Sequence, residues 1–262
     1  MTIADAFRLD GRRLFITGGS RGLGREMALA IAEAGADVVM VGRDAASLEA
    51  TAGEIRGLGR TCEVLVGDVG IPEECERVCR DALDRHGPFD ILINNVGGRR
   101  INVPLQEQTL DEWRQILDLN LTSTFLCMKH IGGAMLGRET GSGGRIINIA
   151  SIAGQVIFRG MGGRSYETAK AAVIQLTKAA AADWATHGVT VNAICPGGFM
   201  TEPNQRWQRL DPQFTERAVA QIPQGVFGQP EDLGPLAVYL ASDAARYVTG
   251  TAIVIDGGYT AW

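Results

Sequence analysis

Tyr166 and Lys170 stand four residues apart in an Ala-rich segment, residues 165–187, whose pattern predicts a helix. Residues at positions i and i+4 lie on the same face of a helix, so we expect the phenol and the ammonium group to be neighbours. Free Tyr has a pKa of about 10, and a nearby cation favours its phenolate. The pair is a candidate proton donor with an electrostatic partner, although a Tyr and a Lys on an exposed helix surface have the same spacing.

A glycine-rich turn, residues 17–24, joins an apolar run at 14–16 to a helical segment that begins near Arg25. Glycine allows positive φ and close approach of the backbone, and the first N–H groups of a helix carry partial positive charge. This arrangement predicts a binding site for a pyrophosphate. The spacing G-x3-G-x-G is neither the commoner G-x-G-x-x-G nor a phosphate loop, so a tight turn that binds nothing is the alternative.

Segments of strand and helix character alternate along the chain, which predicts an α/β fold: a doubly wound parallel sheet of about seven strands with helices on both faces. The strands are expected at residues 14–16, 37–42, 62–68, 89–94, 145–151, 189–195 and 252–258, the last of them buried. The helices are expected at residues 25–35, 44–58, 72–86, 109–136, 165–187 and 230–241. Residues 210–222 are less regular and are a candidate lid. No repeat or domain boundary appears, so residues 1–262 are expected to form one domain.

Sheets of this kind bind ligands beyond the carboxyl ends of their strands, where the strand order switches. The residues expected at that edge are 17–24, Gly42 and Arg43, Asp68, 94–97, Ser151, and 196–201. The helix that carries Tyr166 and Lys170 begins next to the same edge. The sequence therefore predicts one site that combines the glycine turn with the Tyr–Lys pair.

The composition excludes several classes of protein. A net charge of −5 gives no basic face for a nucleic acid, and the chain has neither a leader-like apolar stretch nor a membrane-spanning run, so we expect a soluble, cytoplasmic protein. Five cysteines without a C-x-x-C motif indicate reduced thiols rather than disulfides or a zinc site. Three isolated histidines have no metal-ligand spacing, and no metal is predicted.

Together these residues resemble the short-chain dehydrogenase/reductase family over essentially the whole chain. The matching motifs are T-G-x-x-x-G-x-G at 17–24, N-N-x-G at 94–97, a helix asparagine at Asn120, a strand-end serine at Ser151, Y-x-x-x-K at 166–170, and P-G at 196–197 followed by Thr201. Six motifs in the family's order are far more specific than any one of them. The resemblance implies a Rossmann fold and an NAD(P)-dependent oxidoreductase that interconverts secondary alcohols and ketones.

The resemblance also implies residue roles. Tyr166 would exchange a proton with the substrate oxygen, and Ser151 would hydrogen-bond that oxygen. Lys170 would lower the pKa of Tyr166 and bind the nicotinamide ribose, while Asn120 would hold a water that supplies protons to Lys170. Asp68 would contact the adenine. The implied cofactor-binding residues are Gly18, Ser20, Arg21, Gly22, Leu23, Gly24, Arg43, Asp68, Val69, Asn94, Gly97, Tyr166, Lys170, Pro196, Gly197, Phe199 and Thr201.

The choice between NAD and NADP depends on charge at the end of the second strand. NAD users of the family place an acidic residue there, whereas this chain has Gly42 followed by Arg43, with Arg21 in the glycine turn. Two guanidinium groups with no carboxylate between them suit a 2′-phosphate, so we predict a preference for NADP. The alternative is that Arg43 stacks on the adenine and Asp44 supports NAD.

Arginines near the predicted site bear on the substrate. Arg99 and Arg100 follow the N-N-x-G motif, which resembles the gluconate 5-dehydrogenase branch, and Arg159 and Arg164 precede Tyr166. A cationic mouth would favour a polar or anionic substrate such as a sugar acid, although each arginine alone is equally well explained as solvated. The alternatives are a 3-oxoacyl-carrier-protein reductase and, in another class, a non-catalytic dinucleotide-sensing protein.

The resemblance further implies a homotetramer, with a dimer as the alternative, formed through the helices after Thr109 and Ser165. The C-terminal residues 259–262 are candidates for such an interface.

Overall fold

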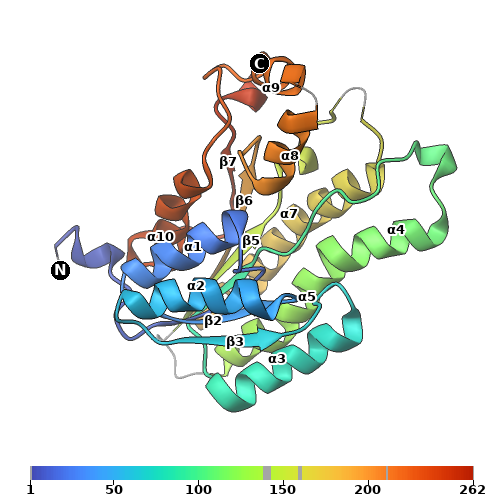
Figure 1. Cartoon of the computed structure of the whole chain (residues 1–262). Coiled ribbons are helices and arrows are strands. Elements are labelled where there is room, and N and C mark those ends of the chain that lie inside the picture. The colour runs from blue at the N-terminus through green and yellow to red at the C-terminus, as the bar shows by residue number, and fades with distance from the viewer. Residues whose placement is uncertain (1, 138–142, 159–160, 211, 262) are drawn as a thin grey trace.

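Seven parallel strands form one sheet in the computed structural model, which describes residues 2–137, 143–158, 161–210 and 212–261 (Figure 1). The strand order is β3-β2-β1-β4-β5-β6-β7, so the order switches between β1 and β4. The strands are β1 (Arg13–Thr17), β2 (Asp37–Gly42), β3 (Cys62–Val66), β4 (Ile91–Asn94), β5 (Gly144–Ile149), β6 (Val189–Pro196) and β7 (Ala252–Ile255). The predicted doubly wound parallel sheet is confirmed.

Helices cover both faces of this sheet (Figure 1). They are α1 (Gly22–Glu33), α2 (Ala45–Gly57), α3 (Pro72–His86), α4 (Leu110–Leu117), α5 (Ser123–Cys127), α6 (Gly133–Leu136), α7 (Arg164–Trp184), α8 (Glu202–Leu210), α9 (Pro212–Val219) and α10 (Gly234–Ala241). Within β1, Leu14 and Ile16 pack toward α1, α2 and α10, whereas Phe15 packs toward α3, α5 and α7. Because side chains alternate along a strand and both faces are covered, the strands are continuous apolar runs.

The long helix predicted at 109–136 begins as expected but is not regular. Thr109 accepts a hydrogen bond from the backbone N–H of Glu112 and completes a capping box with it. The structure then interrupts the helix with two π-helical segments, Asp118–Thr122 and Met128–Gly132. Helical periodicity in a sequence does not reveal such a widened turn, because it changes the register by only one residue.

Two other expectations about elements were wrong. Residues 210–222 contain the end of α8 and the whole of α9, so this region is largely helical rather than irregular. Strand β7 is half-buried rather than buried, because it is the last strand of the sheet and pairs only with β6. Among the described residues, no helix has the length and apolar character needed to cross a lipid bilayer.

Candidate active site

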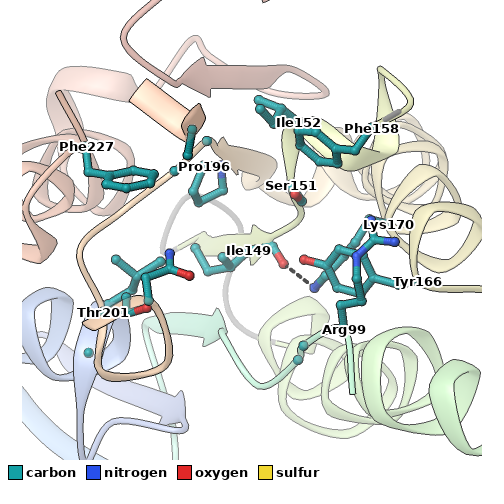
Figure 2. A pocket seen from close by; sticks show the side chains of 18 of the residues that line it. Arg99, Ile149, Ser151, Ile152, Phe158, Tyr166, Lys170, Pro196, Thr201 and Phe227 are labelled. Atoms are coloured by element: carbon teal, nitrogen blue, oxygen red, sulfur yellow. Dashed lines mark hydrogen bonds between the residues drawn. The ribbon is translucent and has the colours of Figure 1, made fainter. Parts of the chain in front are cut away.

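A cavity of about 1380 Å³ opens beyond the carboxyl ends of β1, β4, β5 and β6. It brings together most of the residues that the sequence assigned to one site. The predicted residues that line it are Arg21, Gly22, Leu23, Gly24, Arg43, Gly97, Ser151, Tyr166, Lys170, Pro196, Gly197 and Thr201. Figure 2 shows Arg99, Tyr166 and Lys170 on one side of the cavity, with Thr201 and Phe227 on the other.

The glycine turn forms the wall next to α1. Gly18 and Gly22 have φ values of +69° and +54°, and a Cβ on Gly24 would lie 2.1 Å from the carbonyl oxygen of Gly18. Arg21, at the start of α1, makes no side-chain capping hydrogen bond, so the first N–H groups of this helix are available to a ligand. A Cβ on Gly22 would meet only Thr201, at 3.8 Å. This open cradle fits a pyrophosphate.

Tyr166 and Lys170 share one face of α7, as predicted; Lys170 is buried and Tyr166 is half-buried. The Nζ atom of Lys170 donates to the carbonyl oxygen of Ile149 at 2.8 Å and lies 5.9 Å from the centre of the Tyr166 ring (Figure 2). Burial lowers the pKa of Lys170 to about 8. Burial also raises the pKa of Tyr166, and hydrogen bonding by Ser151 and the charge of Arg99 act in the opposite direction. The pKa of Tyr166 therefore lies above its ordinary value here, and the lowering by Lys170 that the resemblance implies stays a prediction.

Of the two cations that lie over the Tyr166 ring in the described part of the chain, Arg99 is closer than Lys170. Its guanidinium carbon lies 5.0 Å from the ring centre, and its side chain is only 12% exposed. Arg99 forms an ion pair with Glu167 at 3.1 Å, and Arg164 pairs with the same carboxylate at 2.7 Å. Glu167 therefore neutralises part of the positive charge that these two arginines were expected to offer a substrate, and the two guanidinium groups together keep a net positive charge. Arg159 lies outside the described residues.

Asn120 lies in the π-helical segment Asp118–Thr122 and is fully buried. Its Nδ2 donates to the carbonyl oxygen of Ile116, in the last turn of α4, and its Oδ1 accepts from the N–H of Gly98 at 2.8 Å. A Cβ on Gly97 would lie 2.7 Å from Asn120 Oδ1 and 2.8 Å from Lys170 Nζ. The widened helical turn thus brings Asn120 next to Lys170, with Gly97 between them.

Carboxylates lie beside the two arginines assigned to the 2′-phosphate. Arg43 is 3.5 Å from Asp68, and Arg21 is 3.6 Å from Glu202. The expectation of no nearby carboxylate is therefore wrong, because Asp68 follows the neighbouring strand β3 and α8 brings Glu202 across the cavity. Asp44 accepts a hydrogen bond from the N–H of Ser47 and so caps α2.

Some predicted cofactor residues direct their side chains away from the cavity. Val69 and Phe199 are buried in the two cores, and the Asn94 amide donates to Asn148 at 2.8 Å. None of these three residues lines the cavity, and their predicted role in cofactor binding stays a prediction. The predicted residues that do not line the cavity are Gly18, Ser20, Asp68, Val69, Asn94, Asn120 and Phe199.

Several residues of the site received no individual role from the sequence, including Asn95, which was expected only to lie at this edge of the sheet. Asn95 donates to the carbonyl oxygens of Thr17 and Gly18, both at 3.1 Å, and so ties the glycine turn to the end of β4. Its place in the N-N-x-G motif could have predicted that Asn95 has a role in the site. Other cavity residues come from segments without a recognisable motif: Phe158, Met161, Glu202, Gln221, Ile222, Phe227 and Tyr259.

All five cysteines are free and buried. Cys75 and Cys79 on α3 each place Sγ 3.7 Å from Sγ of Cys127 on α5, and the three sulfur atoms lie within 4.8 Å of one another. They belong to the apolar core between α3, α5 and the sheet. Free cysteine packs there as a small apolar side chain, so the sulfur contacts are explained by core packing.

Comparisons with known proteins agree with this geometry. A family model described as "Enoyl-(Acyl carrier protein) reductase" matches residues 18–260. The chain is 36% identical over 262 residues to a galactitol 2-dehydrogenase (L-tagatose-forming) from Cereibacter sphaeroides, with 100% of both sequences covered.

Two solved structures are similar over almost the whole chain. A short-chain type dehydrogenase/reductase from Mycobacterium marinum has a TM-score of 0.88 and 37% identity, with 99% of each chain covered. A gluconate 5-dehydrogenase from Burkholderia cenocepacia J2315, solved with NADP and tartrate, has a TM-score of 0.90 and 34% identity, with 100% of each chain covered. The chain therefore belongs to the short-chain dehydrogenase/reductase family of NAD(P)-dependent oxidoreductases that act on CH–OH groups.

Proposed function

We propose that this protein is an NADP-linked dehydrogenase that interconverts a secondary alcohol and a ketone on a small polar substrate, such as a polyol or a sugar acid. The observation that carries the proposal is the convergence of Ser151, Tyr166 and Lys170 in the cavity that also contains the glycine turn. A protein that only senses a dinucleotide would not need these three side chains together.

The cavity offers a place for each part of the cofactor. Residues 22–24 would hold the pyrophosphate, Arg21 and Arg43 the 2′-phosphate, and Pro196, Gly197 and Thr201 the nicotinamide end. When bound, the nicotinamide ring supplies a hydride to the substrate carbon or accepts one from it.

Side chains of the protein would transfer the proton to or from the substrate oxygen. During reduction, the Tyr166 hydroxyl donates its proton to the substrate oxygen, and the Ser151 hydroxyl hydrogen-bonds the same oxygen. Arg99 stabilises the phenolate that remains, because its charge acts to lower the pKa of Tyr166. Lys170, with a pKa of about 8, is able to exchange a proton near neutral pH, and Asn120 lies next to it. In the oxidation direction the same groups act in reverse.

The cavity wall and the relatives support a polar substrate. Arg99 is a cation beside Tyr166, and Gln221 and Tyr259 line the same cavity. One relative is named for galactitol, and a solved gluconate 5-dehydrogenase contains tartrate. Polyols and sugar acids have the hydroxyl and carboxylate groups that such side chains bind.

A panel of polyols, sugar acids, simple ketones and 3-oxoacyl thioesters, assayed with both cofactors, tests this proposal. We expect turnover on a polyol or a sugar acid with higher kcat/KM for NADP than for NAD. Tyr166→Phe should lower kcat by about 10²–10⁴-fold and leave the Kd for NADPH within about twofold of the native value. Turnover confined to 3-oxoacyl thioesters would favour the acyl reductase instead, and native turnover in the Tyr166→Phe variant would refute the assigned mechanism.

A further inference from the structure

Glu167 follows Tyr166 directly in the sequence, and its side chain is only 5% exposed. A buried carboxylate loses its water of hydration, which is costly unless charged partners replace that water. Arg99 Nη2 donates to Glu167 Oε1 at 3.1 Å, and Arg164 Nη1 donates to Oε1 at 2.8 Å and to Oε2 at 2.7 Å. Both carboxylate oxygens therefore have charged donors, and the proposed mechanism gives this ion-pair network no role.

The network joins segments that are far apart in the sequence. Arg99 comes from the loop after β4, and its Nη1 also donates to the carbonyl oxygens of Gly162 and Gly163, which precede α7. The N–H of Gly163 donates in turn to the carbonyl oxygen of Val103, in the same loop as Arg99, at 2.9 Å. Hydrogen bonds in both directions thus connect the loop after β4 to the beginning of α7.

The guanidinium group of Arg99 reaches both Tyr166 and Glu167. Its carbon lies 5.0 Å from the centre of the Tyr166 ring and 6.0 Å from the centre of the Phe158 ring. Consecutive residues of a helix do not face each other, so Tyr166 and Glu167 present different sides of α7 to Arg99. The rings attract the cation weakly, whereas the carboxylate and the two carbonyl oxygens each accept a hydrogen bond from it, so these acceptors fix its orientation.

We infer that Glu167 is a positioning residue that holds the guanidinium group of Arg99 over the Tyr166 ring. This inference rests on the proposed function, in which Arg99 stabilises the Tyr166 phenolate, and adds a residue that acts through Arg99. Glu167 does not line the cavity, so it has no contact with a ligand there. Because Arg164 shares the carboxylate, the network keeps a net positive charge although it contains an anion.

The charge of Glu167 and its hydrogen bond to Arg99 have opposite effects on Tyr166. A nearby carboxylate disfavours the phenolate, whereas the charge of Arg99 acts to lower the pKa of Tyr166. Loss of the carboxylate alone would therefore lower this pKa, but loss of the carboxylate together with the position of Arg99 would raise it. The other polar or charged groups that act on Tyr166 or lie over its ring in the described part of the chain are Ser151, Lys170 and Cys195.

Titration of the tyrosines in the full-length protein, without substrate or cofactor, tests this inference. The ultraviolet absorbance of tyrosinate would be followed against pH, and subtraction of the curve of the same protein carrying Tyr166→Phe isolates Tyr166. We expect Glu167→Ala to move the Tyr166 transition to higher pH by about 0.5–1.5 units, as Arg99→Gln would. Glu167→Gln, which keeps an oxygen that accepts from Arg99, should not move it to higher pH.

Two controls decide whether Glu167 acts through Arg99. In the double variant with Glu167→Ala and Arg99→Gln, the transition should lie where it lies in Arg99→Gln alone. Asp243→Ala removes the carboxylate partner of Arg145, a buried arginine 3.0 Å away that does not line the cavity, and should leave the transition unchanged. If Glu167→Ala fails to fold, Glu167→Asp replaces it: its shorter side chain keeps the charge but withdraws the acceptor, so a smaller move to higher pH is expected.

A transition that stays in place or moves to lower pH in Glu167→Ala, or in Glu167→Asp where that variant replaces it, would overturn the inference. Glu167 would then act by its charge alone or not at all. A move that persists in the Arg99→Gln background, or that also occurs in Asp243→Ala, would overturn it as well. A native protein without dehydrogenase turnover would refute the proposed function, whereas the titration would still decide whether Glu167 holds Arg99.

Discussion

At the scale of single residues, the environment of Tyr166 differs from the one its spacing suggested. Lys170 lies four residues away on the same helix face, but its Nζ atom points to the carbonyl oxygen of Ile149. The permanent positive charge over the ring belongs to Arg99, which comes from the loop after β4. In the proposed mechanism, the guanidinium group of Arg99 would therefore stabilise the phenolate of Tyr166.

Arg99→Gln tests this role of Arg99. Removal of the cation is expected to raise the pKa of Tyr166 further, so the kcat/KM for alcohol oxidation should reach its half-maximal value at a higher pH, by about 0.5–1.5 units. Arg99→Lys should restore part of the shift. The measurement is the pH profile of kcat/KM for each variant, and an unchanged profile in Arg99→Gln would show that the cation does not act on Tyr166.

The pKa of Lys170 predicts how stability depends on pH. Unfolded Lys has a pKa of about 10.4, whereas burial lowers that of Lys170 to about 8. Between these values the unfolded state binds more protons, so the free energy of unfolding should rise with pH by up to about 1.4 kcal/mol per unit. Below about pH 8 the residue is charged in both states, and the full cost of burying the charge is present.

Urea unfolding from about pH 8 to about pH 10 would measure this effect. Lys170→Met removes the titrating group, so the rise with pH should be smaller in the variant than in the native protein. All other groups are the same in both proteins, and the difference between the two curves isolates Lys170. Parallel curves would contradict a lowered pKa.

At the scale of elements, the π-helical segment Asp118–Thr122 and the loop after β4 position the site together. Gly97 has no room for a side chain, because Asn120 Oδ1 and Lys170 Nζ occupy the positions around its Cβ direction. The glycine, in the loop after β4, therefore leaves room for two polar groups that come from helical segments far apart in the sequence, the π-helical segment and α7.

Gly97→Ala should disturb this arrangement. The added methyl group displaces Asn120 or Lys170, and we expect kcat/KM to fall at least about tenfold and Tm to fall by about 3–10 °C. Gly53→Ala is a matched control, since Gly53 lies in α2 with no heavy atom within 4 Å of the added Cβ. It should leave activity unchanged and Tm equal or slightly higher. Native activity in Gly97→Ala would show that the added methyl group displaces neither Asn120 nor Lys170.

At the scale of the whole molecule, exposed apolar side chains occur on α4 and α5 and just before α4. Leu105 and Leu110 are each 60% exposed, and Phe125 on α5 is 48% exposed. Large apolar side chains that are exposed in a single chain are candidate contacts between subunits. They are consistent with the expected homotetramer, which remains a prediction, and Trp262 lies outside the described residues.

Light scattering after gel filtration would test the assembly. We expect the native protein to have the mass of four copies of the 28.0 kDa chain, and Phe125→Glu to give smaller species. Tyr247→Glu is the control, because Tyr247 is fully exposed and lies away from this helix in the sequence. A monomeric native protein would contradict the prediction.

The sequence by itself determined the order of the elements and the residue types at the strand ends. Apolar runs, glycine turns and capping residues act over a few positions, so α3 and β2 were predicted with the bounds that the structure has. The meeting of the glycine turn with Ser151, Tyr166 and Lys170 also followed, because the carboxyl ends of parallel strands share one edge of a sheet.

Only the tertiary structure decided which groups face one another. It paired Arg99 with Glu167, directed Asn94 toward Asn148, and placed Asp68 beside Arg43. It also widened the helix around Asn120. These outcomes depend on packing between segments far apart in the chain and on the burial that sets each pKa, and no local pattern of residues contains that information.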